Sequence, residues 1–423
     1  MAFVRAEVVG AGMAGLAAAV ELTAAGLPVS LSEAGPRAGG RCRSYFDPSL
    51  GLTIDNGNHL VLAGNPAVAH FRATVGADAP LAGPPHATFA FADMATGERW
   101  TLRINDGPVP WWVLVPSRRV PGSRLADYLP LGRLLKGRAD QTIGDLVRPQ
   151  GPVWERMLHP VLLAALNTDP AASSAALCAN VLAETLAKGG RASAPRVAVP
   201  TLAAAFIDPA VGWLEAQGVA LQTGRRLRGI RFEGDGVSAL EWADGAQAIG
   251  ADEAVVLAVP AWVAAALVPD LTVPDDHRSI LNAHFACVPP PGAPEMLGLT
   301  NATSEWIFTH PDRISVTISG ADRLMDEDRE ALAAMIWAEV AQALGITAPM
   351  PRWQIVKEKR ATFAATPEQD ARRPHTNTRW RNLFLAGDWV QNGLPATIEG
   401  AIRSGDSAAR LVLGQPLKYG KGQ

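Results

Sequence analysis

The sequence predicts an α/β fold built on a parallel sheet, and two features at opposite ends of the chain carry this prediction. Near the N-terminus, a short buried strand over Ala6 to Val9 precedes a glycine-rich turn, a helix over Leu16 to Ala25 and a second strand over Val29 to Leu31. Near the C-terminus, an apolar strand over Asn382 to Ala386 leads through a polar turn into a helix. The length of 423 residues suits two or three domains.

The composition excludes several classes of protein. Hydrophobic residues make up 48% and charged residues 19% of the chain, so a disordered or disulfide-scaffold protein is excluded. The net charge of -3 gives no information about nucleic acid, and we expect no nucleic-acid partner. The three cysteines, Cys42, Cys178 and Cys287, lie far apart and in no Cys/His cluster, so we expect no metal site and a reducing, cytoplasmic location. No apolar stretch reaches the roughly 18 residues of a membrane-spanning helix.

The glycines of the N-terminal turn have the spacing of a dinucleotide site. Gly10, Gly12 and Gly15 lie between strand and helix, and Glu33 ends the second strand, where the ribose of a dinucleotide would lie. Gly10 permits a tight turn, Gly12 lets the backbone approach a pyrophosphate, and Gly15 allows the helix to pack closely on the strand. The helix N-terminus attracts the phosphate charge. These features predict nucleotide binding over an accidental glycine-rich turn, but they do not separate NAD from FAD.

A second glycine-rich loop follows Glu33 directly and favours a flavin. The loop spans residues 35–41, contains two cations and ends in Gly39, Gly40 and Arg41. It is suited to hold the remaining phosphate and the ribityl chain of a flavin, and the alternative is an ordinary exposed Pro/Gly loop. Residues 54–59 then form a tight turn by composition.

The C-terminal helix supplies a matching signal. Gly387 and Asp388 break the preceding strand, and the helix is predicted from about Ala396 to Leu413. Small residues between positions 399 and 405 are expected to let the helix backbone approach a flat ligand. The N–H groups at its start would point at the electron-rich edge of an isoalloxazine ring. The alternative is a C-terminal helix that packs on a sheet.

Together these motifs resemble the flavin-containing amine oxidase and phytoene desaturase superfamily. Three further runs are similar to the hydroxysqualene dehydroxylases, the squalene-associated branch of that superfamily in bacterial hopanoid biosynthesis. These runs are Ile54 to Leu60, His159 to Thr168 and Gly387 to Gly400. The resemblance spans nearly the whole chain.

The resemblance implies a discontinuous, Rossmann-like FAD-binding domain with an inserted α+β substrate-binding domain. The expected limits are 1–75, 195–262 and 376–423 for the FAD-binding domain, and 76–194 and 263–375 for the substrate-binding domain. Strands between Val219 and Val259 would complete the nucleotide sheet. The second domain would contain hairpin strands around residues 88–104, helices within 124–186, strands within 280–319, a helix over 327–344 and a strand over 353–360.

The implied activity is the reductive dehydroxylation of hydroxysqualene to squalene by hydride transfer from reduced FAD. Such chemistry needs a dry cavity and few acid-base groups. The leaving hydroxyl needs a proton, for which His59 and Asp55 are the candidates next to the flavin. As alternatives, His59 is a structural histidine and Asp55 caps its own turn. Asn167 and Asn392 are further polar candidates, or else helix-end and turn residues.

FAD is expected to bind without a covalent bond. No cysteine lies near the C-terminal flavin loop and no lysine is in place to face flavin N5, which also disfavours amine oxidation. With only one dinucleotide fingerprint, the electron donor is not identified. The predicted FAD contacts are Gly10, Gly12, Met13, Ala14, Gly15, Glu33, Ala34, Gly39, Gly40, Arg41, Asn56, Gly57, Leu227, Gly387, Asp388, Pro395, Ala396, Thr397 and Ile398.

Two other functions stay open from the sequence. One is a carotenoid-type desaturase or another oxidoreductase of the superfamily. The other is a non-enzymatic protein that binds prenyl groups, since Rab escort and GDP-dissociation proteins share this architecture. Retention of both flavin loops disfavours the second.

The segment 108–138 is rich in tryptophan and cations. Trp111 and Trp112 precede six cations that face one acid, Asp127, which gives a local charge of +5. This pattern predicts peripheral contact with the inner face of the cell membrane, through a helix face lined by Leu125, Tyr128, Leu129 and Leu135. The alternatives are a core strand with a solvated charged face and a cover over the substrate cavity.

Overall fold

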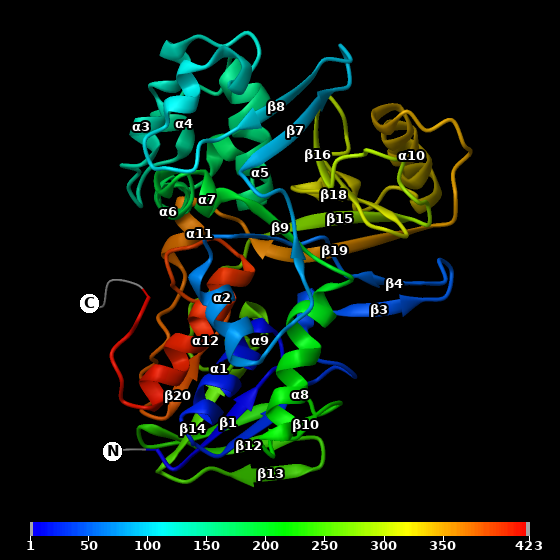
Figure 1. Cartoon of the computed structure of the whole chain (residues 1–423). Helices are drawn as coiled ribbons and strands as arrows, with labels where there is room; N and C mark the ends of the chain where they lie inside the picture. The colour runs from blue at the N-terminus through cyan, green and yellow to red at the C-terminus, as the bar shows by residue number, and fades with distance from the viewer. Residues whose placement is uncertain (1–2, 420–423) are drawn as a thin grey trace.

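The computed structural model describes residues 3–419 and has a parallel sheet at one end and a larger, mostly antiparallel sheet at the other, in which only β7 and β16 pair in parallel (Figure 1). The ends of the expected FAD-binding segments, residues 1–2 and 420–423, lie outside the described residues. The helices are α1 Met13–Ala24, α2 Pro66–Thr74, α3 Leu131–Leu134, α4 Ile143–Leu146, α5 His159–Leu166, α6 Ala175–Glu184, α7 Gly190–Ser193, α8 Asp208–Ala216, α9 Ala261–Leu267, α10 Arg329–Leu344, α11 Pro367–Ala371 and α12 Ile398–Val412.

The nucleotide sheet has five parallel strands in the order β10-β2-β1-β14-β20. In β1, Val8 lies opposite Leu31 on one side and Val256 on the other. Residues 6–9 of β1 are all buried, so both faces of the sheet are covered, and the central strands are accordingly mostly apolar. These strands are β1 Arg5–Val9, β2 Val29–Ser32, β10 Leu221–Gln222, β14 Glu253–Leu257 and β20 Leu383–Leu385.

Only part of the meander between positions 219 and 259 joins this sheet, which corrects the sequence prediction. Its first and last strands, β10 and β14, are nucleotide-sheet strands, but β11 Gly229–Glu233, β12 Gly236–Trp242 and β13 Gly245–Ala248 form a separate antiparallel sheet. Gly234 and Gly245, both with positive φ, let these strands fold back on one another. A parallel sheet would instead need long crossovers between them.

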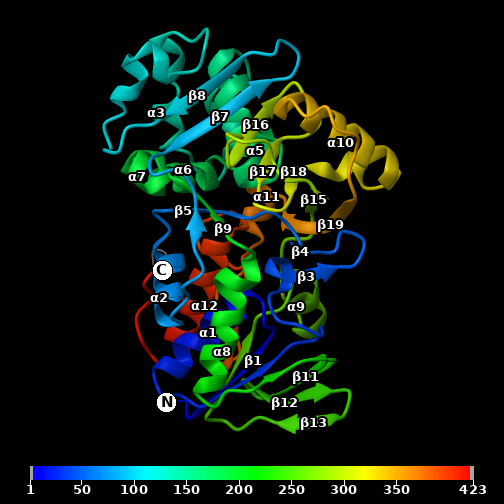
Figure 2. The ribbon, with the colours of Figure 1, turned by 45° about the vertical axis from the view of Figure 1, so that its right-hand side comes forward.

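The two ends of the chain pack together through α1 and α12, which lie side by side in both views (Figures 1 and 2). A Cβ at Gly405 would collide with the Ala14 carbonyl and meet the Ala17 side chain at 2.9 Å. Gly405 therefore serves close helix packing and does not face a flat ligand, whereas the approach of the other small residues of α12 to such a ligand stays a prediction. The predicted start of α12 at Ala396 is two residues early, since the helix begins at Ile398.

The second large sheet has seven strands in the order β19-β15-β18-β17-β16-β7-β8. The hairpin predicted around residues 88–104 is confirmed as β7 and β8. Helix α10 begins at Arg329, two residues later than predicted, because the Asp328 carboxylate caps its N-terminus. The strands are β7 Thr88–Asp93, β8 Arg99–Arg103, β15 His277–Phe285, β16 Met296–Thr300, β17 Trp306–Thr309, β18 Ile314–Ile318 and β19 Trp353–Phe363.

Two small sheets lie between these layers. The pairs are antiparallel in both, and their strands are β3 Ser44–Asp47, β4 Leu52–Asp55, β5 Leu60–Leu62, β6 Leu81–Ala82 and β9 Pro195–Ala198. Strand β9 pairs with both β5 and β6, so the chain near position 195 lies beside the segments near positions 61 and 81.

The segment 108–138 forms short 3₁₀ turns followed by α3, at the end of the molecule away from the nucleotide sheet (Figure 2). Trp112 is only 4% exposed and packs edge-on against buried Tyr128, with ring centroids 5.5 Å apart. These two side chains therefore belong to the core, which corrects the prediction that both face a membrane. Trp111, Leu125, Leu129 and Leu135 are exposed.

Candidate functional site

The N-terminal glycine turn has the geometry of a phosphate cradle. Gly10 has φ +105°, and a Cβ on Gly15 would collide with the Gly10 carbonyl, so both positions exclude a side chain. A Cβ on Gly12, by contrast, meets no protein atom within 4 Å. Gly12 also precedes the N-terminus of the 12-residue helix α1. Space, free N–H groups and a helix dipole therefore coincide at Gly12, as binding of a pyrophosphate requires.

Glu33 lies beside this cradle. Its carboxylate accepts hydrogen bonds from the backbone N–H groups of Ala11, at 2.9 Å, and Gly35, at 2.7 Å. The backbone of Arg225 donates to the Glu33 carbonyl at 2.9 Å, so the stretch that leads to buried Leu227 runs alongside. The acid is thus held next to the glycine turn, where it can bind the ribose of FAD.

The second glycine loop is packed against the first. The Gly39 N–H donates to the Ala11 carbonyl at 2.8 Å, and Gly39 forms a β-bridge with Gly12. Gly39 and Gly40 have φ values of +105° and +54°, which favour glycine. The packing against the first turn disfavours the alternative of an ordinary exposed loop.

An ion pair joins this loop to the C-terminal motif. Arg41 Nη2 lies 2.6 Å from Asp388 Oδ1, and Arg41 Nη1 donates to the Ala361 carbonyl at 2.6 Å. The Gly387 N–H donates to the Ser404 hydroxyl at 2.9 Å, which fixes the loop to α12. Residues from both ends of the chain and from β19 therefore meet at one place.

Arg373 is a functional candidate that the sequence reasoning missed. Its buried guanidinium donates to the carbonyls of Asp388, Val390 and Leu394, at 3.2, 2.7 and 2.9 Å. It also pairs with Asp370 at 2.9 Å. Arg373 holds the C-terminal flavin loop in shape, but no local pattern around it in the sequence indicates this role.

At the start of α12, side chains bind several protein groups, and the expectation that the N–H groups of residues 396–398 point at the flavin stays a prediction. The Thr397 side chain caps the helix by accepting from the Gly400 N–H at 3.0 Å. The Glu399 carboxylate accepts from the N–H groups of Ala67 and Val68 at the start of α2, and it pairs with Arg403 at 2.7 Å. The first turn of α12 therefore binds protein groups through its side chains.

His59 lies at the junction of the two flavin loops, near the main chain of Arg41 and the carboxylate of Asp388. Burial, together with the positive charge of Arg41, lowers the pKa of His59 to about 4. The imidazole is therefore neutral at pH 7. A neutral imidazole donates a hydrogen bond but is a poor proton donor, which disfavours His59 as the general acid.

Asp55 has structural partners on both oxygens. Oδ1 accepts from the Ser44 hydroxyl at 2.5 Å and from the Leu202 N–H at 2.9 Å, and Oδ2 lies 3.9 Å from Arg313. Burial raises the pKa of Asp55 despite these partners. The contacts tie β4 to the chain near position 202, so Asp55 caps a distant turn and not its own.

The neighbouring turn residues also bind protein. Asn56 Nδ2 donates to Glu358 Oε2 at 3.2 Å, and a Cβ on Gly57 would lie 3.1 Å from the Asn282 side-chain amide. The turn is thereby fixed to β15 and β19. FAD contacts by Asn56 and Gly57 stay predictions, as do the other FAD contacts predicted from the sequence.

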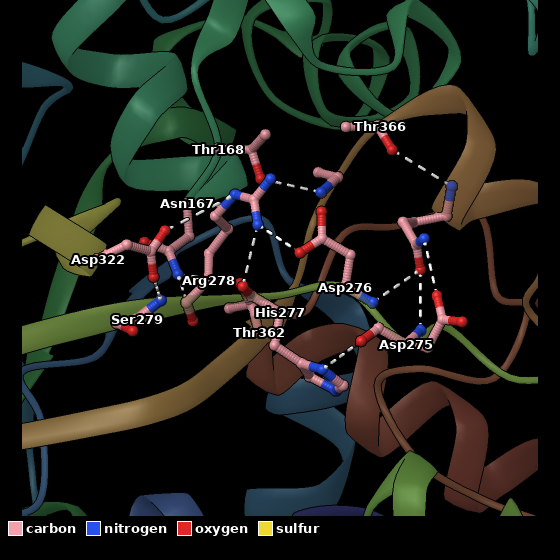
Figure 3. Close-up of polar contacts among 12 residues, drawn as sticks. Asn167, Thr168, Asp275, Asp276, His277, Arg278, Ser279, Asp322, Thr362 and Thr366 are labelled. Atoms are coloured by element: carbon pink, nitrogen blue, oxygen red, sulfur yellow. Dashed lines mark hydrogen bonds and ion pairs between the residues drawn. The ribbon is translucent and has the colours of Figure 1, made fainter.

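Asn167 and Asn392 are a helix-end residue and a turn residue. Asn167 ends α5 with φ +48°, donates to the Thr362 hydroxyl at 2.9 Å and accepts from the Gly320 N–H at 2.7 Å. Figure 3 shows Asn167 and Thr168 against residues of β15 and β19. Asn392 accepts from the Leu394 N–H at 2.9 Å. In residues 3–419, no group of three or more His, Cys, Asp or Glu side chains is placed to hold a metal.

The comparisons with known proteins agree with this geometry. The family described as flavin containing amine oxidoreductase matches residues 13–413. The chain belongs to this family. It is therefore an FAD-dependent oxidoreductase, and the open space at Gly12 beside Glu33 fits that cofactor.

Among curated relatives, the chain is 50% identical to the hydroxysqualene dehydroxylase of Rhodopseudomonas palustris, over 96% of this chain and 98% of that one. It is 48% identical to the enzyme of the same name in Sinorhizobium fredii, over 97% and 98%. Identity to the zeta-carotene desaturase of Synechocystis is 24%, over 97% of both chains.

Solved structures share the fold at low sequence identity. An oxidoreductase from Methanosarcina mazei superposes with a TM-score of 0.71 at 14% identity, over 95% of this chain and 99% of that one. Cyclohexylamine oxidase from Brevibacterium oxydans gives a TM-score of 0.69 at 15% identity, over 97% and 99%. The α/β fold predicted from the sequence is confirmed.

Proposed function

We propose that this protein catalyses the reductive dehydroxylation of hydroxysqualene to squalene in hopanoid biosynthesis. The observation that carries the proposal is the identity of 47–50% to three proteins named hydroxysqualene dehydroxylase, over 96–97% of the chain. Because the matched length includes the middle of the chain as well as both flavin motifs, it supports a shared substrate along with a shared cofactor.

The reaction exchanges a C–O bond for a C–H bond. The hydroxyl leaves its carbon as water after taking up one proton, and the carbon accepts one hydride. When bound in its reduced state, FAD supplies that hydride. Each turnover consumes two electrons, so a separate electron donor, which no motif identifies, must restore the reduced cofactor.

The chain's own residues bind the cofactor without a covalent bond in this proposal. Gly12 and the start of α1 hold the pyrophosphate, and Glu33 binds a ribose. The Arg41–Asp388 pair closes the two loops around the flavin end of the site. Cys42, which directly follows Arg41 in the sequence, is buried, and burial raises the pKa of its thiol to about 12. The thiol is therefore protonated and unreactive.

His59 has an orienting role in this proposal. Because its imidazole is neutral, it donates one hydrogen bond to the hydroxyl of the substrate and does not protonate it. Asp55 acts indirectly, since its carboxylate fixes the strand that leads to His59.

The substrate is an isoprenoid lipid in this proposal. None of the helices within residues 3–419 is long and apolar enough to cross a bilayer. A lipid of this kind resides in membranes, so we infer that the protein works in contact with the inner face of the cell membrane.

The test is an anaerobic single turnover. The purified yellow protein is reduced with dithionite and mixed with hydroxysqualene, and the products are analysed by mass. We expect one squalene per flavin and the return of oxidised flavin absorbance at the same rate. A variant that cannot retain FAD is the control and should form no squalene.

Two results would identify one of the two alternative functions instead. Oxidised polyene from a carotene substrate, with no squalene from hydroxysqualene, would identify a desaturase related to the Synechocystis enzyme. A colourless protein that binds hydroxysqualene unchanged would identify a non-enzymatic binder of prenyl lipids.

A further inference from the structure

Exposed apolar side chains are concentrated in one short part of the chain. In the described residues, twelve large hydrophobic side chains are exposed, and six of them lie between positions 109 and 135. Leu129 is 77% exposed and Leu114 is 64% exposed. Single exposed apolar side chains are ordinary, but such a group marks an interaction site. The six residues are Val109, Trp111, Leu114, Leu125, Leu129 and Leu135, and we call them the apolar face.

Buried side chains of the same segment pack beneath the apolar face. Beneath it, Trp112 packs against Tyr128, and the Tyr128 hydroxyl accepts from the Val120 N–H at 2.9 Å. Leu134, the last residue of α3, is buried and belongs to the same hydrophobic cluster as Trp112 and Tyr128. Because these contacts join the turns of the segment, the exposed side chains are presented by one packed unit, at the end of the molecule away from the nucleotide sheet (Figure 2).

The segment that carries the apolar face is also rich in cations. Arg138 pairs with Asp140 at 3.1 Å, but the other five cations of the segment form no ion pair with any residue in 3–419. One of them, Arg118, stacks on the exposed ring of Trp111 at 4.6 Å. The five are Arg118, Arg119, Arg124, Arg133 and Lys136.

We propose that the apolar face inserts into the headgroup region of an anionic phospholipid bilayer, with these five cations on the lipid phosphates. Apolar side chains among unpaired cations complement a surface that is apolar below and negative above. A water-filled protein interface would instead favour acidic partners for the cations. This inference deepens the proposed function, since a membrane-resident isoprenoid substrate has to reach the enzyme from a bilayer.

The apolar part is tested with the double variant Leu114→Glu/Leu129→Glu. The holoenzyme is sedimented with vesicles of phosphatidylglycerol and phosphatidylcholine at low salt. We expect the wild-type protein to bind and the double variant to bind at least 10-fold more weakly. Val288→Glu is the matched control, because Val288 is 72% exposed but lies outside the segment, and it should bind like the wild type.

The charged part is tested with Arg124→Gln and Lys136→Gln, both at exposed positions outside the flavin site. Each should weaken binding to phosphatidylglycerol vesicles by about 5-fold, and binding to pure phosphatidylcholine should change little. Added salt should reproduce the effect.

Several outcomes would overturn the proposal. These are wild-type protein that stays in the supernatant, a double variant that binds as well as the wild type, or self-association in solution that the double variant abolishes. Turnover of detergent-dispersed hydroxysqualene separates this proposal from the proposed function: it should be equal in wild type and double variant. If neither the wild type nor the double variant turns over the substrate but vesicle binding follows the predicted order, the proposed function is wrong and the membrane-binding proposal is supported.

Discussion

Gly12 shows how one missing side chain leaves room for a cofactor. Its backbone, with φ −76° and ψ −179°, is open to any residue, and no protein atom lies within 4 Å of a Cβ built on it. The fold therefore does not need a glycine at this position, whereas a cofactor that approaches the backbone does. Gly15 is the opposite case, because its side-chain position is filled by the Gly10 carbonyl.

We expect Gly12→Val to fold normally and to lose FAD. The purified variant should lack flavin absorbance at about 450 nm, and its unfolding temperature should equal that of wild-type apoprotein within about 2 °C. Gly15→Val is the contrasting control and should fail to fold. A yellow Gly12→Val protein with full flavin content would contradict the assignment of the phosphate cradle.

Arg373 also supports the flavin site, but it does so through contacts with protein groups and not with the cofactor. Its guanidinium is buried and makes four hydrogen bonds, three of them to carbonyls of the loop between β20 and α12. A planar group with several donors can serve these acceptors together, whereas a lysine ammonium cannot reach them all. The role of Arg373 is to position the loop.

At the scale of elements, this loop between β20 and α12 is the part of the flavin site that depends on distant support. It carries Asp388, whose carboxylate pairs with Arg41 of the N-terminal loop. Its shape comes from Arg373 on one side and from the Ser404 hydroxyl of α12 on the other. Loosening one support should therefore weaken flavin binding without removing any group that touches the flavin.

We expect Arg373→Lys to raise the dissociation constant for FAD by about 10-fold or more, since it removes at least one charge-assisted hydrogen bond of about 1.5–3 kcal/mol. The measurement is a fluorescence titration of apoprotein with FAD. Arg372→Lys is the matched control, because the neighbouring Arg372 forms an ion pair with Asp275 at the surface. Equal FAD affinity in the two variants would show that the loop holds its shape without Arg373.

At the scale of the whole molecule, the flavin site connects all parts of the chain. The N-terminal turn, the C-terminal loop and β19 of the large sheet meet at Arg41. The turn after β4 contacts β15 and β19 through Asn56 and Asn282. Because both sheets contribute contacts, cofactor binding should stabilise both.

Removal of FAD should lower the unfolding temperature of the entire protein in one transition. Binding to the native state alone adds about 2.7 kcal/mol at a free FAD concentration 100 times the dissociation constant. Calorimetry of apoprotein with increasing FAD is the measurement, and the single transition should move upward with concentration. Two transitions, of which FAD moves only one, would mean that the two sheets unfold independently.

The sequence by itself determined the features that depend on neighbouring residues. The strand, glycine turn, helix and acid at the N-terminus were predictable because the glycine conformations and the strand and helix periods are local properties. The strand and helix at the C-terminus were predictable for the same reason, as was the hairpin β7–β8.

Only the tertiary structure decided the features that depend on partners far away in the chain. Gly405 of α12 packs on α1, Trp112 turns inward onto Tyr128, and Arg373 binds a loop 15 to 21 residues away. The neutral state of His59 is another such feature, because it results from burial and from the charge of Arg41. Composition and spacing specify which side chains are present, but burial and long-range contacts determine which of them face the cofactor, the core or the surface.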